Sequence, residues 1–197
     1  MHDTIAVIDF GGQYAHLIAT KLRRLGVHSV IKDPDDPVSA YDGLRGIILS
    51  GSPALASQGE EQDYEKGIYD LEIPILGFCF GHQEIVQHYG GKVEHRAKEY
   101  GPADWHLAQN DSPITKGLDP VEPVFMSHGD SVVSVPDGFV ELGYSRLGDG
   151  PKHAFTAVAD DQRKRYGFQF HPEVDDTVHG EQMLANFCFE VCQCEPT

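Results

Sequence analysis

The segment Gly77-Phe78-Cys79-Phe80-Gly81 constrains the fold of this chain more than any other, because it places a cysteine between two glycines. The apolar run 73–76 before it is typical of a buried strand, and residues 83–89 after it are typical of a helix that Gly90-Gly91 ends. A cysteine on such a turn has the geometry of a nucleophile elbow, with Cys in place of Ser. A free cysteine is also often a small buried hydrophobe, so the rest of the chain has to decide between chemistry and packing.

Composition limits the classes of protein to consider. The chain has 197 residues, enough for one domain with its own core, and 40% of them are hydrophobic. Its net charge of −16 repels nucleic-acid phosphates and anionic membranes. No apolar run approaches the length of a membrane span, and the first residues do not resemble a signal peptide, so we expect a cytoplasmic protein. The four cysteines form neither a disulfide framework nor a metal-ligand pattern, so no metal site is expected.

Strand and helix patterns alternate through the first half of the chain. Helical periodicity covers 13–25, a helix is expected around 61–71, and another at 83–89. Near-continuous apolar strands are expected at 4–9, 27–32, 45–50 and 73–76. This alternation predicts an α/β fold with an open, mostly parallel sheet and helices on both faces.

The second half has a different pattern. Short strands punctuated by Pro and Gly are expected, and a final helix is expected within 175–192. The strands are predicted at 93–95, 103–107, 124–126, 132–135, 139–144, 153–158 and 165–170. No repeat or linker separates the halves, so we expect one domain, 1–197, with a small antiparallel sheet in its second half.

A base for the cysteine is suggested by His171-Pro172-Glu173, which follows the strand pattern 166–170. Residues two apart in an extended backbone project from the same side, so Glu173 can hold the His171 imidazole while that ring faces Cys79. Three loops leave the carboxyl ends of parallel strands: Gly11-Gly12, Gly51-Ser52-Pro53 and the Cys79 turn. Ligands bind at that edge of such sheets, so these loops are expected to share one crevice.

Together these segments resemble the class I (triad) glutamine amidotransferases, through 77–83 and Phe170-His171-Pro172-Glu173. Within that family the chain is similar to the glutaminase part of GMP synthases, on the segments 9–14, 48–53, 127–130 and 166–180. The resemblance covers nearly the whole chain and implies a flavodoxin-like α/β fold. The chain differs from the family at Gly51-Ser52-Pro53, where the family commonly has Gly-Gly-Pro. The peptide at Ser52 is therefore expected to rotate less freely than one at glycine.

The resemblance also implies roles for individual residues. Cys79 is expected to attack the side-chain amide of glutamine, with His171 as proton carrier and Glu173 as its partner. The oxyanion hole is expected to use the backbone N–H groups of Phe80 and Ser52. The glutamine-binding residues implied by the family pattern are Gly51, Gln83, Ser127, Gly129 and Asp130, the last three in a loop.

A synthetase partner follows from the same resemblance. Two-domain GMP synthases continue into an ATP pyrophosphatase domain, whose Ser-Gly-Gly-x-Asp-Ser phosphate loop does not occur in this chain. We therefore expect no cofactor here, with ATP and Mg on an ATP pyrophosphatase subunit or domain that aminates XMP to GMP. The alternatives are the glutaminase of anthranilate, aminodeoxychorismate or carbamoyl phosphate synthesis, a non-catalytic regulatory module on the same fold, and a cysteine peptidase or γ-glutamyl hydrolase.

Overall fold

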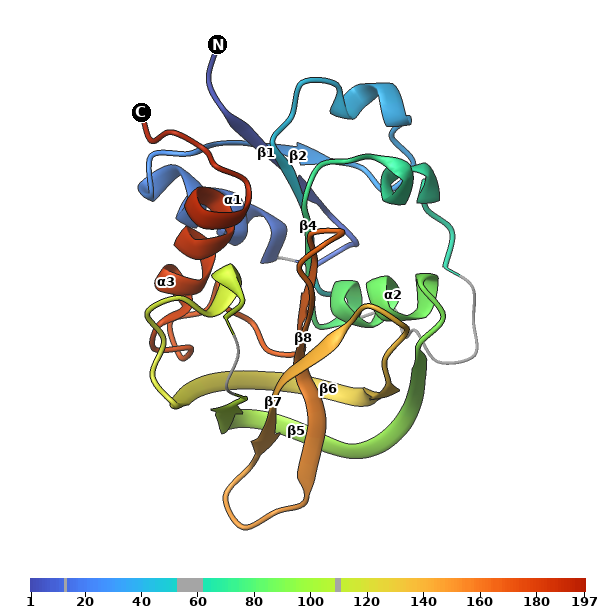
Figure 1. Cartoon of the computed structure of the whole chain (residues 1–197), viewed down its shortest axis with the longest axis vertical. Helices are drawn as coiled ribbons and strands as arrows, with labels where there is room; N and C mark the ends of the chain where they lie inside the picture. The colour runs from blue at the N-terminus through green and yellow to red at the C-terminus, as the bar shows by residue number, and fades with distance from the viewer. Residues whose placement is uncertain (13, 53–61, 109–110) are drawn as a thin grey trace.

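A nine-stranded sheet runs through the molecule in the order β2-β1-β3-β4-β9-β8-β7-β5-β6, as the computed structural model shows (Figure 1). The structure describes residues 1–12, 14–52, 62–108 and 111–197. The strands are β1 (Thr4–Ile8), β2 (His28–Lys32), β3 (Gly46–Leu49), β4 (Ile75–Phe78), β5 (Lys92–Leu107), β6 (Val121–Ser134), β7 (Val140–Arg146), β8 (Lys152–Asp160) and β9 (Arg165–Phe168).

The parallel half of the sheet consists of β2, β1, β3, β4 and β9, and each of their pairings is parallel. Strands β3, β4 and β9 are buried along their whole length, which explains the continuous apolar sequences of β3 and β4. The four parallel strands predicted in the first half are confirmed within a few residues. Their carboxyl ends lie at one edge of the sheet, where the Cys79 turn follows β4.

Helices cover both faces of this parallel half, as predicted. Alternate residues of each strand point to opposite faces, so Ile5 and Val7 belong to one hydrophobic cluster while Ala6 and Ile8 belong to another. The first cluster includes residues of α1 (Tyr14–Arg24), α3 (Gly180–Ala185) and the π-helix Asn186–Val191. The second includes residues of α2 (Phe80–His88). Figure 1 shows α1 and α3 on one side of β4 and α2 on the other.

The antiparallel strands are continuous with the parallel sheet and do not form a separate one. Strand β8 pairs antiparallel with β9, and β7, β5 and β6 follow in that order. The short strands predicted at 93–95 and 103–107 belong to the single strand β5, and those at 124–126 and 132–135 belong to β6. Gly101 and Pro102, which lie between the two predicted strands, remain in the ladder opposite Met126 and Phe125.

The helix predicted at 61–71 is wrong for the described residues of that segment. Residues 62–65 are not helical, Lys66–Asp70 forms a 3₁₀ helix, and Glu61 lies outside the described residues. The Glu65 side chain accepts a hydrogen bond from the Gly67 N–H at 2.8 Å. Ile68 and Tyr69 are buried in the cluster that covers α2, so packing decides this segment. Two further 3₁₀ helices are Val38–Tyr41 and Pro113–Thr115.

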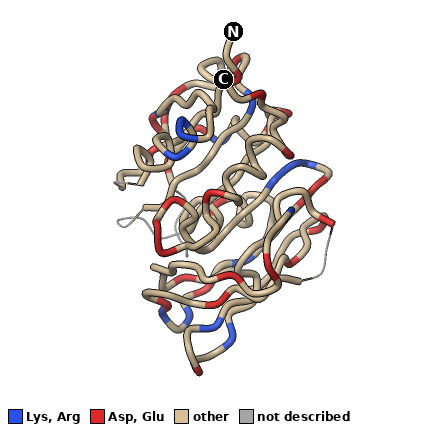
Figure 2. Tube along the Cα trace, turned by 90° about the vertical axis from the view of Figure 1, so that its left-hand side faces the viewer, with Lys and Arg blue, Asp and Glu red and all other residues tan. Residues whose placement is uncertain are grey.

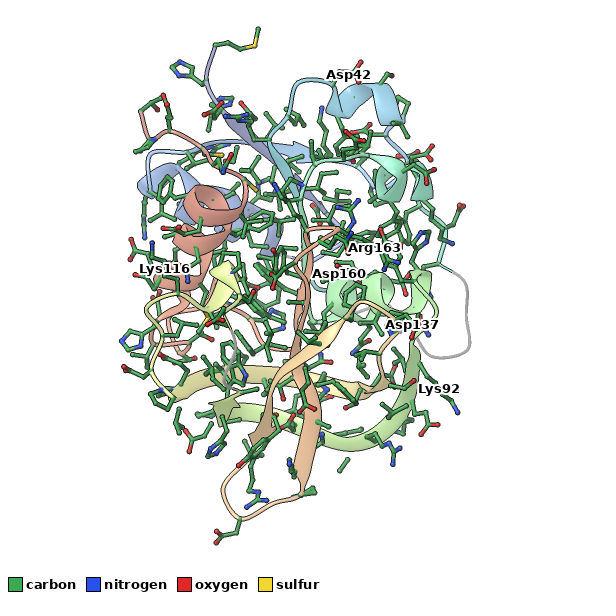
Figure 3. All side chains as sticks on the ribbon, in the orientation of Figure 1. Asp42, Lys92, Lys116, Asp137, Asp160 and Arg163 are labelled. Carbon is green, nitrogen blue, oxygen red and sulfur yellow. The ribbon has the colours of Figure 1, made fainter. Side chains whose placement is uncertain are left out.

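Acidic residues are spread over the molecule rather than gathered in one segment, and basic residues are fewer (Figure 2). Figure 3 shows Arg163 beside Asp160, in the turn between β8 and β9. An ion pair of 3.0 Å joins them, and Arg163 also donates to the Asp137 carbonyl at 3.3 Å. This turn aligns β9, the strand that leads to His171. In the described part of the chain, no helix has the length and apolar composition needed to cross a bilayer.

Candidate active site

Cys79 lies on a sharp turn between β4 and α2, as the sequence predicts. Its backbone has φ 52° and ψ −108°, a positive-φ conformation that few non-glycine residues adopt. The Cys79 N–H donates to the Phe168 carbonyl at 2.8 Å, and its own carbonyl accepts from the Gln83 N–H at 3.1 Å. The strained residue is therefore held by β9 on one side and by the first turn of α2 on the other.

The two glycines around Cys79 are needed because their backbones touch. A Cβ atom on Gly77 would lie 2.4 Å from the Gly81 carbonyl carbon, and one on Gly81 would lie 2.5 Å from the Leu49 carbonyl oxygen. Real Cβ atoms do not approach backbone atoms so closely. The turn thus needs glycine at both positions to bring α2 against β3 and β4.

We expect Gly77→Ala to destabilise the protein by at least about 3 kcal/mol, because the contacting atoms are backbone and cannot move aside. Urea unfolding measures this. Gly90→Ala is the control for an open site: unlike Gly77, Gly90 has a positive φ of 102°, but a Cβ there would have nothing within 4 Å. That control is expected to cost only about 1–2 kcal/mol from backbone strain. Equal losses in the two variants would contradict the close-packing explanation.

His171 and Glu173 form a buried pair just beyond β9. The His171 Nδ1 and Glu173 Oε1 atoms are 2.7 Å apart, and Glu173 is 0% exposed. Burial alone would lower the pKa of His171, but the Glu173 carboxylate and hydrogen bonding with Cys79 and Glu173 raise it well above its ordinary value of 6.5. The backbone is fixed as well, because Thr177 Oγ1 donates to the His171 carbonyl at 2.7 Å.

Gly51 lies between the histidine and the cysteine. A Cβ atom on Gly51 would be 2.9 Å from His171 Cε1 and 3.4 Å from Cys79 Cβ. The loop after β3 therefore packs against both side chains, and only a residue without a side chain fits there. The Cys79 turn and the Gly51 loop thus meet at this edge of the sheet, as expected, together with the His171 segment. Gly11 and Gly12, the third loop expected there, do not line the cavity beside Cys79, and Pro53 lies outside the described residues.

A cavity of about 380 Å³ opens beside Cys79. The cavity is lined by six of the site residues that the sequence predicts: Ser52, Cys79, Gln83, Ser127, Gly129 and Asp130. Cys79 is 8% exposed there, and its Sγ lies 3.5 Å from the Ser127 carbonyl oxygen. The Gln83 side chain donates from Nε2 to the Asp130 carbonyl at 2.8 Å and to Gln169 Oε1 at 3.1 Å. The cavity wall opposite Cys79 is thus tied to α2.

The part of Phe80 that matters for the site is its backbone, because Phe80 directly follows Cys79 in the chain. It is the first residue of α2, and an N–H group in the first turn of a helix has no acceptor within that helix. Its ring is buried against Phe10, with ring centres 5.1 Å apart. The packing of the ring therefore fixes the peptide that follows Cys79.

The segment Ser127-His128-Gly129-Asp130 lies inside strand β6, and not in a loop as the sequence suggested. It pairs with β5, which places Tyr100 opposite Ser127 and His95 opposite Asp130. The cavity is also lined by His95, Lys98 and Tyr100 of β5, which the sequence analysis missed. A register shift between His95 and Glu99 brings these side chains to the cavity wall. The pairing of β5 with β6 in this register has no signal in the sequence.

The family model described as glutamine amidotransferase class-I matches residues 6–191. A probable glutamine-hydrolysing GMP synthase of Leptospira interrogans is 41% identical over 100% of this chain and 32% of its own length. The glutamine-hydrolysing GMP synthases of Symbiobacterium thermophilum and Aquifex aeolicus are both 43% identical, over 98% and 97% of this chain. The chain covers 37% of each of those two, so it spans about a third of the length of the curated relatives it matches.

Two solved structures are similar to the whole chain. A putative GMP synthase subunit from Thermoplasma acidophilum has a TM-score of 0.82 and 29% identity, and the match covers 98% of this chain and 95% of that one. A glutamine amidotransferase from Thermotoga maritima has a TM-score of 0.68 at 19% identity, covering 100% of this chain and 87% of that one. The second similarity shows the fold alone.

Proposed function

Since the chain belongs to the class-I glutamine amidotransferase family, we propose that it hydrolyses glutamine and supplies the ammonia to the synthetase part of a GMP synthase. The observation that carries the proposal is that Cys79 lies on a strained turn and that Gly51 packs against both Cys79 and His171, the partner of Glu173. The relatives named GMP synthase support the choice of acceptor.

Cys79 is the nucleophile of the proposed reaction. Its S–H group gives its proton to His171 while the sulfur bonds to the side-chain amide carbon of glutamine, and the carbonyl electrons move onto oxygen. The Phe80 and Ser52 N–H groups are the proposed donors to that oxyanion. When the C–N bond breaks, His171 gives its proton to the nitrogen and ammonia leaves. The Glu173 carboxylate raises the pKa of His171 and so favours the protonated ring that this step uses.

Water completes the cycle. The γ-glutamyl thioester left on Cys79 is attacked by a water molecule that gives a proton to the now neutral His171. The carbon–sulfur bond breaks, glutamate is released, and Cys79 and His171 return to their starting state. Glu173 is 0% exposed and 2.7 Å from the ring, so it keeps one tautomer and one orientation through both steps.

The charges around the cavity suit an amino acid. Asp130 and Lys98 both line it, and they present opposite charges to a zwitterion. We assign the α-ammonium group of glutamine to the Asp130 side and its α-carboxylate to the Lys98 side. Gln83, Ser127 and Gly129 also line the cavity, and Gly51 packs against Cys79 and His171.

Reconstitution tests the proposal. The chain is mixed with a GMP-forming ATP pyrophosphatase subunit, XMP, ATP, Mg and glutamine, and GMP is followed. We expect GMP formation that depends on glutamine and on this chain, whereas ammonium salts support GMP formation by the partner alone. If glutamate is released but GMP does not form from glutamine, the proposed glutaminase activity stands and the link to GMP synthesis fails. The chain would then be assigned as the glutaminase of another pathway.

A further inference from the structure

A buried carboxylate lies behind the cavity wall, in a place that the reaction does not use. Glu99 of β5 is 1% exposed and lies directly opposite His128 of β6. Its Oε1 is 2.8 Å from His128 Nε2, and the Ser145 hydroxyl lies 3.2 Å from both of its carboxylate oxygens. His153 Nδ1 is 3.7 Å from the same Oε1. A buried carboxylate needs such partners, because an unpaired one is costly.

The other nitrogen of His128 is also engaged. His128 Nδ1 lies 2.8 Å from the Asp130 carbonyl oxygen, which can only accept a hydrogen bond. Nδ1 therefore carries a hydrogen, and Nε2 faces the Glu99 carboxyl group. With both nitrogens engaged, the ring has one orientation in which all its polar atoms are satisfied.

This ring links the buried carboxylate to the cavity. The Asp130 carbonyl accepts from His128 and also from Gln83 Nε2, which lies one turn beyond Cys79 on α2. The neighbours of His128 in the chain, Ser127 and Gly129, both line the cavity, and the Ser127 carbonyl lies 3.5 Å from Cys79 Sγ. A change in the His128 ring therefore moves the wall that faces the nucleophile.

We propose that Glu99 and His128 are positioning residues that hold the 127–130 segment of β6 in place and thereby set the affinity for glutamine, an inference that rests on the function proposed above. They touch neither the reacting carbon nor the leaving nitrogen. Their loss weakens glutamine binding and leaves the intrinsic reactivity of Cys79 in place.

The test uses Glu99→Gln, which keeps the shape of the side chain and removes its charge. Alkylation of Cys79 by iodoacetamide is followed with and without glutamine, by mass spectrometry of the peptide that contains Cys79. We expect the glutamine concentration that gives half-protection to rise about 10- to 100-fold, as for loss of a hydrogen bond to a charged group. The alkylation rate without glutamine is expected to change less than about twofold, since the nucleophile is not touched.

A matched control exists on β6, the strand that carries His128. Glu122 of β6 is 0% exposed and lies 2.7 Å from His179 Nδ1, but it does not line the cavity. Glu122→Gln is expected to lower stability while leaving the half-protecting concentration unchanged. His128→Gln, which also breaks the contact with Glu99, serves as the second variant if Glu99→Gln does not fold.

The outcomes separate the two proposals. Normal protection by glutamine in both Glu99→Gln and His128→Gln overturns the positioning role while the glutaminase function stands. Equal weakening in Glu99→Gln and Glu122→Gln also overturns it, because general destabilisation would then explain the effect. Absence of protection in the unmodified protein overturns the proposed function and this inference with it.

Discussion

Cys79→Ala is expected to lower glutamine hydrolysis by at least about 10⁴-fold, because the thioester then has no sulfur on which to form. Alanine keeps the Cβ atom, so the strained backbone at φ 52° is unchanged and the fold should be retained. The partner in the reconstituted reaction should still make GMP from ammonium salts. Glutamate release and ammonia-dependent GMP, measured on the same sample, separate the loss of chemistry from the loss of assembly.

Cys194→Ala is the control for this prediction. Cys194 is buried near the C-terminus, and burial, followed by the nearby Asp3 carboxylate, raises its pKa to about 11. It therefore stays a thiol at neutral pH and is expected to contribute nothing to the reaction. Substantial glutamine hydrolysis by Cys79→Ala, or its loss in a folded Cys194→Ala variant, would contradict the assignment of the nucleophile.

Glu173→Gln is expected to lower kcat for glutamine by about 10²- to 10⁴-fold, the range that a positioned proton carrier supplies. The neutral amide binds the imidazole less strongly than the carboxylate does at 2.7 Å. If its NH₂ group faces Nδ1, it cannot accept the hydrogen bond that the carboxylate accepts from an Nδ1–H ring. Steady-state glutamate release measures the change. A variant that keeps more than a third of the original kcat would show that Glu173 does not support His171.

The same substitution has a predicted pH signature. In the folded protein the pKa of His171 is raised well above 6.5, so its pair with Glu173 stabilises the fold fully below pH 6.5. That contribution is lost as the pH rises through the folded pKa. Urea unfolding should therefore show Glu173→Gln less stable than the unmodified protein by several kcal/mol near pH 6. The difference should shrink in alkaline solution, and a difference that does not depend on pH would contradict this explanation.

The parallel half of the fold and the Cys79 turn were predictable because their signals are local. Strands β1, β3 and β4 are continuous apolar runs, and the glycines around Cys79 mark a turn that only close backbone packing requires. The His171–Glu173 pair was expected from an extended backbone, but the structure forms it through a turn at Pro172 and Glu173, in which the Val174 N–H donates to the His171 carbonyl at 3.5 Å. These signals depend on periodicity and backbone geometry, and not on distant pairing.

The rest of the cavity depends on pairing between strands far apart in the sequence. Ser127 to Asp130 are polar and contain a glycine, so their sequence suggests a loop. In the structure, β5 supplies the hydrogen bonds and Glu99 satisfies His128, so the segment is a strand. The positions of His95, Lys98 and Tyr100 depend on a register shift in that same pairing, which composition does not encode.

The helix predicted at 61–71 was wrong, in its described residues, for a related reason. Its periodicity favours a helix, but Ile68 and Tyr69 are required in the core beneath α2, and Tyr69 and Tyr64 share a hydrogen bond of 2.6 Å between their hydroxyl groups. These tertiary contacts select a single short 3₁₀ helix over a longer α-helix. Local propensity is a weak term where buried aromatic side chains fix the path of the chain.

Acid quenching during turnover tests the central claim most directly. The chain is mixed with a GMP-forming ATP pyrophosphatase subunit, XMP, ATP, Mg and glutamine, stopped in acid within the first turnovers, and digested for mass spectrometry. We predict a γ-glutamyl adduct on the peptide that contains Cys79, which disappears once glutamine is exhausted. Glutamate formed at full rate while Cys79 stays unmodified, or an adduct found only on another residue, would contradict the account.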